Sequence, residues 1–124
     1  MQYDAVLLDD LGVLSQTPDG SLLPYVREPR TRGLLTAVVS NADGPSRPGL
    51  EKLGLVVLSG DTLLRKPDPA VYLLAAQRLR VAPARCVVVD DLAVNVRGAV
   101  AAGMTGVHHV SLERTLQELA ALLV

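Results

Sequence analysis

Three short apolar runs in this chain each end in polar residues of the kind that carry chemistry. The runs, each with the polar residues that follow it, are 5–8 with Asp9, 34–39 with Ser40 and Asn41, and 86–89 with Asp90 and Asp91. Short continuous apolar runs are typical of strands buried on both faces of a parallel sheet. In such a sheet, ligands bind just outside the carboxyl ends of the strands. The pattern therefore predicts that these polar residues share one site.

Between the apolar runs, the spacing of apolar residues changes from the period of a strand to that of a helix. One helix is predicted to have Pro67 at its first helical position, and a second lies between Leu92 and Gly103. A third follows Ser111, which caps it, and a shorter one precedes Gly54. Residues 15–33 are predicted to be loop with at most a helical turn. Strands are predicted at 5–8, 34–39, 55–58, 86–89 and roughly 105–110. Strands that alternate with helices indicate an α/β fold, a parallel sheet with helices on both faces. We expect one domain, residues 1–124.

Composition excludes several classes of partner. The net charge of −1 and the lack of a basic run leave no electrostatic footprint for nucleic acid. No apolar stretch approaches the roughly 18 residues of a membrane span, and no signal peptide opens the sequence. We therefore expect a cytoplasmic protein with no nucleic-acid or membrane partner. The chain lacks Trp and Phe, so Leu, Val and Ala must form its core, and the lone Cys86 is expected to be an inert core thiol.

The polar residues at the predicted strand ends supply the parts that phosphoryl transfer requires. A carboxylate can attack phosphorus and form an aspartyl-phosphate. Neighbouring acids can hold Mg²⁺, which prefers carboxylate, water and phosphate oxygens. A hydroxyl, an amide and a lysine can neutralise and orient the phosphoryl oxygens, and phosphoryl transfer depends mainly on such positioning. The chain offers these groups in Asp9, Asp90, Asp91, Ser40, Asn41 and Lys66.

Four motifs in order resemble those of the haloacid dehalogenase (HAD) superfamily, and the resemblance covers nearly the whole chain. The family's first motif, a strand followed by D-x-D-G-[TV]-L, compares with DDLGVL at 9–14. Its second ends a strand in Ser or Thr, as at Ser40, and its third is a lysine in K-P-D-P, as at 66–69. Its fourth, a strand, an acidic pair and Asp or Asn four residues later, compares with CVVVDDLAVN at 86–95. The resemblance implies a three-layer, Rossmann-like, five-stranded parallel sheet with the 5–8 strand at its centre.

The resemblance also implies roles around a Mg²⁺ ion. Asp9 would be the nucleophile and a metal ligand, and Asp91 the metal ligand of the fourth motif, with Asp90 assisting. Leu11 would offer its backbone carbonyl to the ion, and Asn95 would support the loop. From the residues alone, Asp90 and Asp91 could instead cap the helix that follows them, because aspartate is a good N-cap.

The substrate side is implied in the same way. Ser40 and Asn41 would bind the phosphoryl group, and Lys66 would connect it to Asp9. The plain alternative for Lys66 is a solvated lysine before a helix, which its K-P-D-P setting disfavours. The substrate itself is a phosphorylated compound that the sequence does not identify.

The first motif departs from the family pattern at Leu11. In the family's phosphatases this position is an Asp that serves as general acid and base. Side chains alternate along a strand, so Asp10 points away from the side that Asp9 and Leu11 share and cannot simply substitute. A shift of one residue that makes Asp10 the nucleophile stays open, although the apolar run ends at Asp9.

The second departure is a missing cap. Most relatives carry a helical insertion between the first two motifs, and here only about 25 residues separate them. We therefore expect no cap domain and a site open to solvent unless a second subunit covers it, which makes a homodimer plausible.

Three functional classes follow. The first is a capless, Mg²⁺-dependent phosphohydrolase, slow because Leu11 replaces the acid/base. The second is a non-catalytic domain that binds Mg²⁺ and phosphate, or another protein. The third is a carbon–halogen hydrolase, because dehalogenases of the family also lack the second Asp. This last class is disfavoured, since a capless site has no enclosed apolar pocket for a small haloacid.

Overall fold

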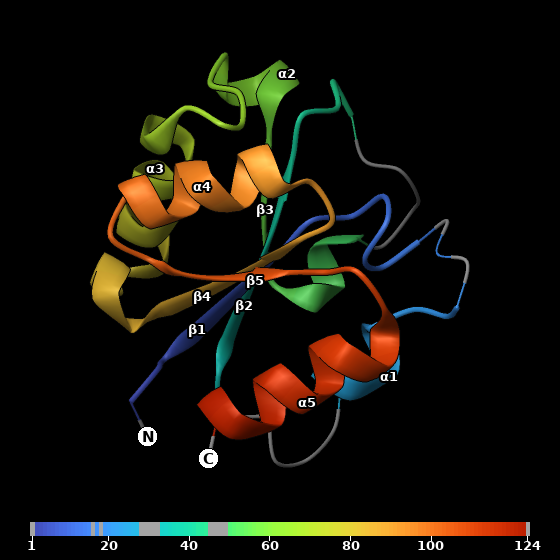
Figure 1. The fold of residues 1–124 in the computed structure, drawn as a ribbon. Coiled ribbons are helices and arrows are strands. Elements are labelled where there is room, and N and C mark those ends of the chain that lie inside the picture. The colour runs from blue at the N-terminus through green and yellow to red at the C-terminus, as the bar shows by residue number, and fades with distance from the viewer. Residues whose placement is uncertain (1, 16, 18, 28–32, 45–49, 124) are drawn as a thin grey trace.

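A computed structural model of the chain describes residues 2–15, 17, 19–27, 33–44 and 50–123. Within these residues, the core is one parallel sheet of five strands in the order β3-β2-β1-β4-β5 (Figure 1). The strands are β1 (Ala5–Leu8), β2 (Leu35–Ser40), β3 (Leu55–Leu58), β4 (Cys86–Asp90) and β5 (Thr105–His108). The predicted α/β fold, with the first strand at the centre, is confirmed.

Helices cover both faces of this sheet, which gives three layers (Figure 1). The helices are α1 (Leu23–Val26), α2 (Ser59–Thr62), α3 (Pro69–Leu79), α4 (Ala93–Ala101) and α5 (Leu112–Leu122), with short 3₁₀ segments η2 (Leu50–Leu53) and η3 (Pro83–Arg85). Side chains of α3 and α4 pack on one face of the sheet, and those of α1 and α5 pack on the other. In the described part of the chain, no helix has the length and apolar character needed to cross a membrane.

The two most buried strands are the ones that the sequence makes continuously apolar. Every residue of β1 and β4 is buried, because each has a strand on both sides and helices above and below. Cys86, the first residue of β4, is buried as predicted, and burial raises the pKa of its thiol to about 11. The edge strand β5 is less buried and ends at His108, earlier than the predicted strand end near residue 110.

Helix α3 corrects one prediction. Pro67 was expected at the first helical position, but the helix begins at Pro69, after Asp68. The carboxylate of Asp68 accepts a hydrogen bond from the Ala70 N–H at 3.0 Å, so Asp68 is the N-cap and the proline that follows it starts the helix. Pro67 instead lies in the loop that carries Lys66, after a cis peptide bond.

The other helix ends are as predicted. Ser111 caps α5, because its hydroxyl accepts a hydrogen bond from the Arg114 N–H. Gly103, with φ of +93°, follows the end of α4 in the left-handed conformation that glycine adopts without strain. Among the described residues of 15–33, the one helix is the single turn α1.

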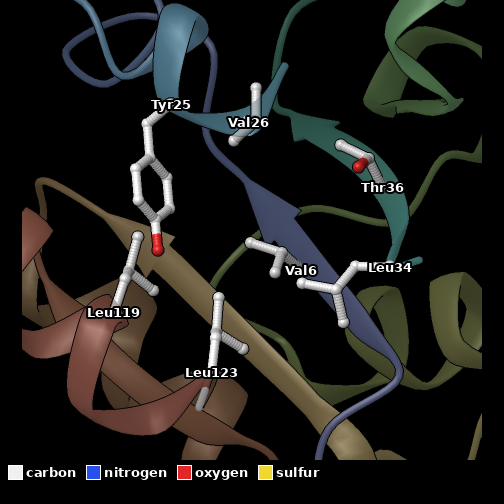
Figure 2. A pocket seen from close by; sticks show the side chains of 7 residues that line it. All are labelled: Val6, Tyr25, Val26, Leu34, Thr36, Leu119 and Leu123. Atoms are coloured by element: carbon white, nitrogen blue, oxygen red, sulfur yellow. The ribbon is translucent and has the colours of Figure 1, made fainter. Parts of the chain in front are cut away.

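A small apolar cavity lies on the α1 and α5 side of the sheet (Figure 2). Its volume is about 10 Å³, which is close to the minimum that holds one water molecule. The side chains around it are Val6, Tyr25, Val26, Leu34, Thr36, Leu119 and Leu123. This volume identifies a packing gap between helices and sheet, too small for a substrate.

Candidate active site

A much larger cleft of about 360 Å³ opens where β1, β2 and β4 end. The residues that line it are Asp9, Leu11, Ser40, Asn41, Ala42, Lys66, Asp91, Leu92 and Asn95. Of the site residues predicted from the sequence, all but Asp90 line this cleft, and Asp90 is buried in contact with Lys66. The structure thus brings together side chains that the sequence separates by as many as 86 positions, from Asp9 to Asn95.

Lys66 connects two of the carboxylates. Its ammonium group donates hydrogen bonds to Asp9 Oδ1 and to Asp90 Oδ2, each at 2.8 Å. The Lys66 side chain is only 3% exposed, so the alternative of a solvated lysine does not describe this residue. A buried ammonium needs such partners, because an unpaired buried charge is strongly destabilising.

Asp9 is partly buried at the end of β1, and its side chain is 13% exposed. Burial raises the pKa of its carboxyl group to about 7, and the charge of Asp90 adds to the rise. The Lys66 ammonium opposes this effect but does not cancel it. In the metal-free protein, ionisation of the Asp9 carboxyl group therefore costs free energy, and a further cation beside it would lower that cost.

Asp10 lies elsewhere. It is buried, it does not line the cleft, and its Oδ1 accepts a hydrogen bond from the Ser15 hydroxyl at 3.3 Å. Its carbonyl accepts hydrogen bonds from three successive N–H groups, those of Val13, Leu14 and Ser15, and so forms the turn after β1. The structure places Asp9 in the cleft and Asp10 beneath the turn, as strand alternation predicts.

Asp90 holds together the loop between β4 and α4. Its two oxygens accept hydrogen bonds from the Leu92 N–H at 2.9 Å, the Asn95 amide at 3.2 Å and the Lys66 ammonium. The Tyr72 hydroxyl in turn donates to the Asn95 carbonyl at 3.0 Å. Neither Asp90 nor Asp91 caps α4, whose N-cap is Leu92 with no side-chain hydrogen bond. The alternative of a capping aspartate is therefore wrong. The Asp90 carboxylate accepts its hydrogen bond from the Leu92 N–H, which precedes the first residue of the helix.

The carboxylates fit a divalent cation. Asp9, Asp90 and Asp91 each offer an oxygen that lies within 4.8 Å of the others, and hard anionic oxygens are the ligands of Mg²⁺. The oxygens of Asp90 are already occupied by three donors. Asp9 and Asp91, which both line the open cleft, are therefore the carboxylates best placed to hold an ion, with Asp90 behind them.

Asn41 has a role that its motif does not reveal. Its side-chain oxygen accepts a hydrogen bond from the Lys66 N–H at 2.8 Å, and its side-chain nitrogen donates to the Lys66 carbonyl at 3.0 Å. The amide side chain is thus used to hold the lysine loop, and one Nδ2 hydrogen and the main chain of Asn41 are left for a substrate. The Ser40 hydroxyl oxygen accepts a hydrogen bond from the Ala42 N–H at 3.1 Å, and its own hydrogen stays available to donate.

Sequence reasoning missed three contacts that shape the cleft. His108 lies 3.0 Å, through Nε2, from the Asp91 carbonyl, and nothing in the motifs indicates this contact. The Asp91 carboxylate lies against Gly12. The position of this glycine in the first motif is a sequence signal for such a close approach. The hydroxyl of Tyr72, three residues after K-P-D-P, supports Asn95.

The chain is similar to known proteins in both sequence and fold. A family model of haloacid dehalogenase-like hydrolases matches residues 4–103. Phosphatase MT3486 of Mycobacterium tuberculosis is 35% identical over 109 residues, which are 82% of this chain and 49% of that protein. The CBBY-like protein of Arabidopsis thaliana is 47% identical over 72 residues, 57% of this chain and 21% of that protein.

The chain thus spans about a fifth and about half of the lengths of these two relatives. A solved structure of an uncharacterized protein from Corynebacterium glutamicum superimposes with a TM-score of 0.81 at 30% identity, covering 98% of this chain and 95% of the other. With the matching family model, the ordered motifs and this fold, the chain belongs to the haloacid dehalogenase-like hydrolases.

Proposed function

We propose that this chain is a Mg²⁺-dependent phosphohydrolase that works through an aspartyl-phosphate on Asp9. One observation carries the proposal: the Asp9 carboxylate lines an open cleft, with the Lys66 ammonium 2.8 Å from one of its oxygens and the Asp91 carboxylate beside it. A carboxylate with a cation next to it and an ion site in reach has the groups needed to attack phosphorus. Relatives named as phosphatases support the same reaction class.

The residues divide the work as follows. Asp9 attacks the phosphorus atom, and Lys66, fixed by Asp90 and by the Asn41 side chain, neutralises charge next to the attacking oxygen. The Ser40 hydroxyl can donate a hydrogen bond to a phosphoryl oxygen. Asp9 and Asp91, with the Leu11 carbonyl, would hold Mg²⁺, which would neutralise the phosphoryl oxygens and align them for attack.

Leu11 limits the rate. General acid–base catalysis contributes typically about 10²–10⁴-fold, and an aliphatic side chain cannot supply it. The other terms, namely positioning and charge neutralisation, do not depend on this residue. We therefore expect a slow enzyme and not an inert one.

A second candidate function follows from the same residue. Leu11 is 47% exposed at the cleft, and a domain that binds Mg²⁺ and phosphate without turnover has no use for an acid at this position. The two candidates differ in one measurable property, the release of inorganic phosphate.

The test is a phosphatase assay on a panel of phosphate monoesters, with Mg²⁺ and with a chelator instead. We expect Mg²⁺-dependent phosphate release by the wild type and none by Asp9→Asn, because an amide cannot form the acyl-phosphate. The matched control is Asp10→Asn, one residue away and outside the cleft, which should retain Mg²⁺-dependent turnover if it folds, as judged by circular dichroism.

Two results would overturn the proposal. Turnover that survives Asp9→Asn but not Asp10→Asn would restore the shifted motif. No turnover under any condition, together with calorimetric binding of phosphate in the presence of Mg²⁺, would establish the non-catalytic alternative.

A further inference from the structure

Two exposed leucines are among the residues that line the cleft. Leu11 and Leu92 both line it, and they are 47% and 53% exposed. Leu11 follows β1 and Leu92 follows β4, the neighbouring strand, so both belong to the rim that also holds Asp9 and Asp91. Because these side chains line the same cleft as Asp9, an apolar group on a substrate bound at Asp9 would cover them.

The described residues that line the cleft offer no spare proton donor. Their ionisable side chains are Asp9, Lys66 and Asp91. Asp9 and Lys66 are hydrogen-bonded to each other, and Asp91 belongs to the proposed ion site. Leu11, two residues after Asp9, lines the same cleft as the nucleophile, and its aliphatic side chain has no proton to donate. A departing oxygen therefore has to leave without being protonated by the described residues that line this cleft.

We propose that the cleft selects phosphate monoesters of acidic hydroxyl groups carried on an apolar body, that is, aryl phosphates and enol phosphates, over phosphates of ordinary alcohols. This inference rests on the proposed function and names its substrate class. A phenolate or enolate leaves as a stable anion and needs no general acid, whereas an alkoxide does. Its apolar body packs on Leu11 and Leu92.

The reaction balances without a proton donor. An oxygen of Asp9 forms a bond to phosphorus while the ester P–O bond breaks, and the electron pair of that bond departs with the phenolate, which takes its proton from bulk water. Water then attacks the phosphorus of the aspartyl-phosphate, the P–O bond to Asp9 breaks, and its electron pair restores the carboxylate. Inorganic phosphate leaves, and the proton lost by the water goes to solvent.

The lack of an acid or base at Leu11 also affects the second step, the hydrolysis of the aspartyl-phosphate. A residue that protonates the leaving group in the first step would deprotonate water in the second, and Leu11 does neither. With an acidic leaving group, formation of the aspartyl-phosphate is assisted by the substrate itself, but its hydrolysis is not. The aspartyl-phosphate should therefore accumulate, and phenol release should begin with a burst.

The experiment measures kcat/KM for a series of substituted phenyl phosphates and an alkyl phosphate, with Mg²⁺ present. The wild type should show kcat/KM that rises steeply with the acidity of the phenol, and a burst of up to one phenol per chain. Leu11→Asp should raise kcat/KM for the alkyl phosphate by roughly 10²-fold or more, change it far less for the most acidic phenol, and abolish the burst. Leu11→Asn, which has the same shape without the acid, is the matched control and should keep the steep dependence.

A second variant tests the apolar contact separately. Leu92→Ser should lower kcat/KM for all phenyl phosphates by roughly four- to tenfold, the effect of losing part of a leucine contact, without changing the dependence on phenol acidity. The apolar part of the inference fails if Leu92→Ser acts equally on phenyl and alkyl phosphates.

The outcomes separate this inference from the function on which it rests. Equal kcat/KM for alkyl and phenyl phosphates in the wild type, with activity lost in Asp9→Asn, would overturn the substrate class and leave the phosphohydrolase intact. Rescue of the alkyl phosphate by Leu11→Asn would show that polarity and not a proton is missing, and would also overturn it. No turnover of any member of the series would end both proposals.

Discussion

The carboxylate of Asp91 lies so close to the α-carbon of Gly12 that a β-carbon there would stand 2.4 Å from Oδ2. Gly12 belongs to the turn after β1, and Asp91 to the loop after β4. The φ of Gly12 is +89°, a backbone conformation that residues with a β-carbon rarely adopt. The glycine thus lets two loops close on one side of the cleft.

Gly12→Ala should therefore lower the free energy of unfolding by at least about 1–2 kcal/mol, because it adds backbone strain and displaces Asp91. Urea denaturation measures the loss. Gly33→Ala is the control, since a β-carbon at Gly33 meets nothing within 4 Å. Equal stability of Gly12→Ala and wild type would show that the Asp91 loop moves away without cost.

The pKa of Asp9 predicts how stability depends on pH without metal. Burial raises this pKa from 3.8 to about 7, so between these values the folded state binds a proton that the unfolded state has lost. The contribution of Asp9 to stability is therefore most favourable below pH 3.8 and declines as the pH rises through the folded-state pKa near 7. Asp9→Asn removes this penalty and should exceed the wild type in stability by up to about 4 kcal/mol at pH 7 and above.

The measurement is urea denaturation of both proteins in chelator from pH 5 to pH 8. The difference should grow up to about pH 7 and then level off. A constant difference across this range would mean that Asp9 is ionised throughout, and would contradict the cause assigned to its raised pKa.

Asp90 and Asp91 should respond differently to the same substitution. Asp91→Asn should weaken Mg²⁺ binding in a calorimetric titration while leaving the fold intact, because Asp91 is the carboxylate free to hold the ion. Asp90→Asn should destabilise the metal-free protein by roughly 1–3 kcal/mol, because the amide replaces a charged acceptor of three hydrogen bonds, two of them buried. Unchanged Mg²⁺ affinity in Asp91→Asn would transfer the ligand role to Asp90.

Asn41→Ala should destabilise the protein by about 1–3 kcal/mol, because it leaves the N–H and the carbonyl of Lys66 without their partners. Ser40→Ala, which removes a single turn hydrogen bond, is the neighbouring control and should cost less. If both variants unfold at the same urea concentration, the Asn41 side chain does not hold the Lys66 loop.

Much of this molecule could be predicted because parallel strands place their carboxyl ends together. The apolar runs before Asp9, Ser40 and Asp90 fixed which residues meet, and the K-P-D-P motif added Lys66. The start of α3 was misplaced because Pro67 and Pro69 both suit a first helical position. Asp68, which can cap only the helix that follows it, decides between them.

The residues alone could not divide the work between Asp90 and Asp91, which are adjacent and chemically identical; it was the family resemblance that assigned the ion to Asp91 with Asp90 assisting. Burial and hydrogen bonding add that Asp90 holds the loop while Asp91 faces the cleft. The contact between Asn41 and Lys66 spans 25 positions. It depends on the path of a loop, which no local pattern encodes.

The cluster around Lys66 also carries an electrical consequence. The Lys66 ammonium contacts the carboxylates of Asp9 and Asp90, and an oxygen of Asp91 lies within 4.8 Å of theirs. When all three carboxylates are ionised, these four described side chains carry an excess of two negative charges. A doubly charged phosphate approaching this surface is repelled, whereas a divalent cation is attracted. In the proposed phosphohydrolase a divalent cation would therefore bind before the substrate, and the supply of magnesium would control access of phosphate esters to the cleft without any part of the protein having to move.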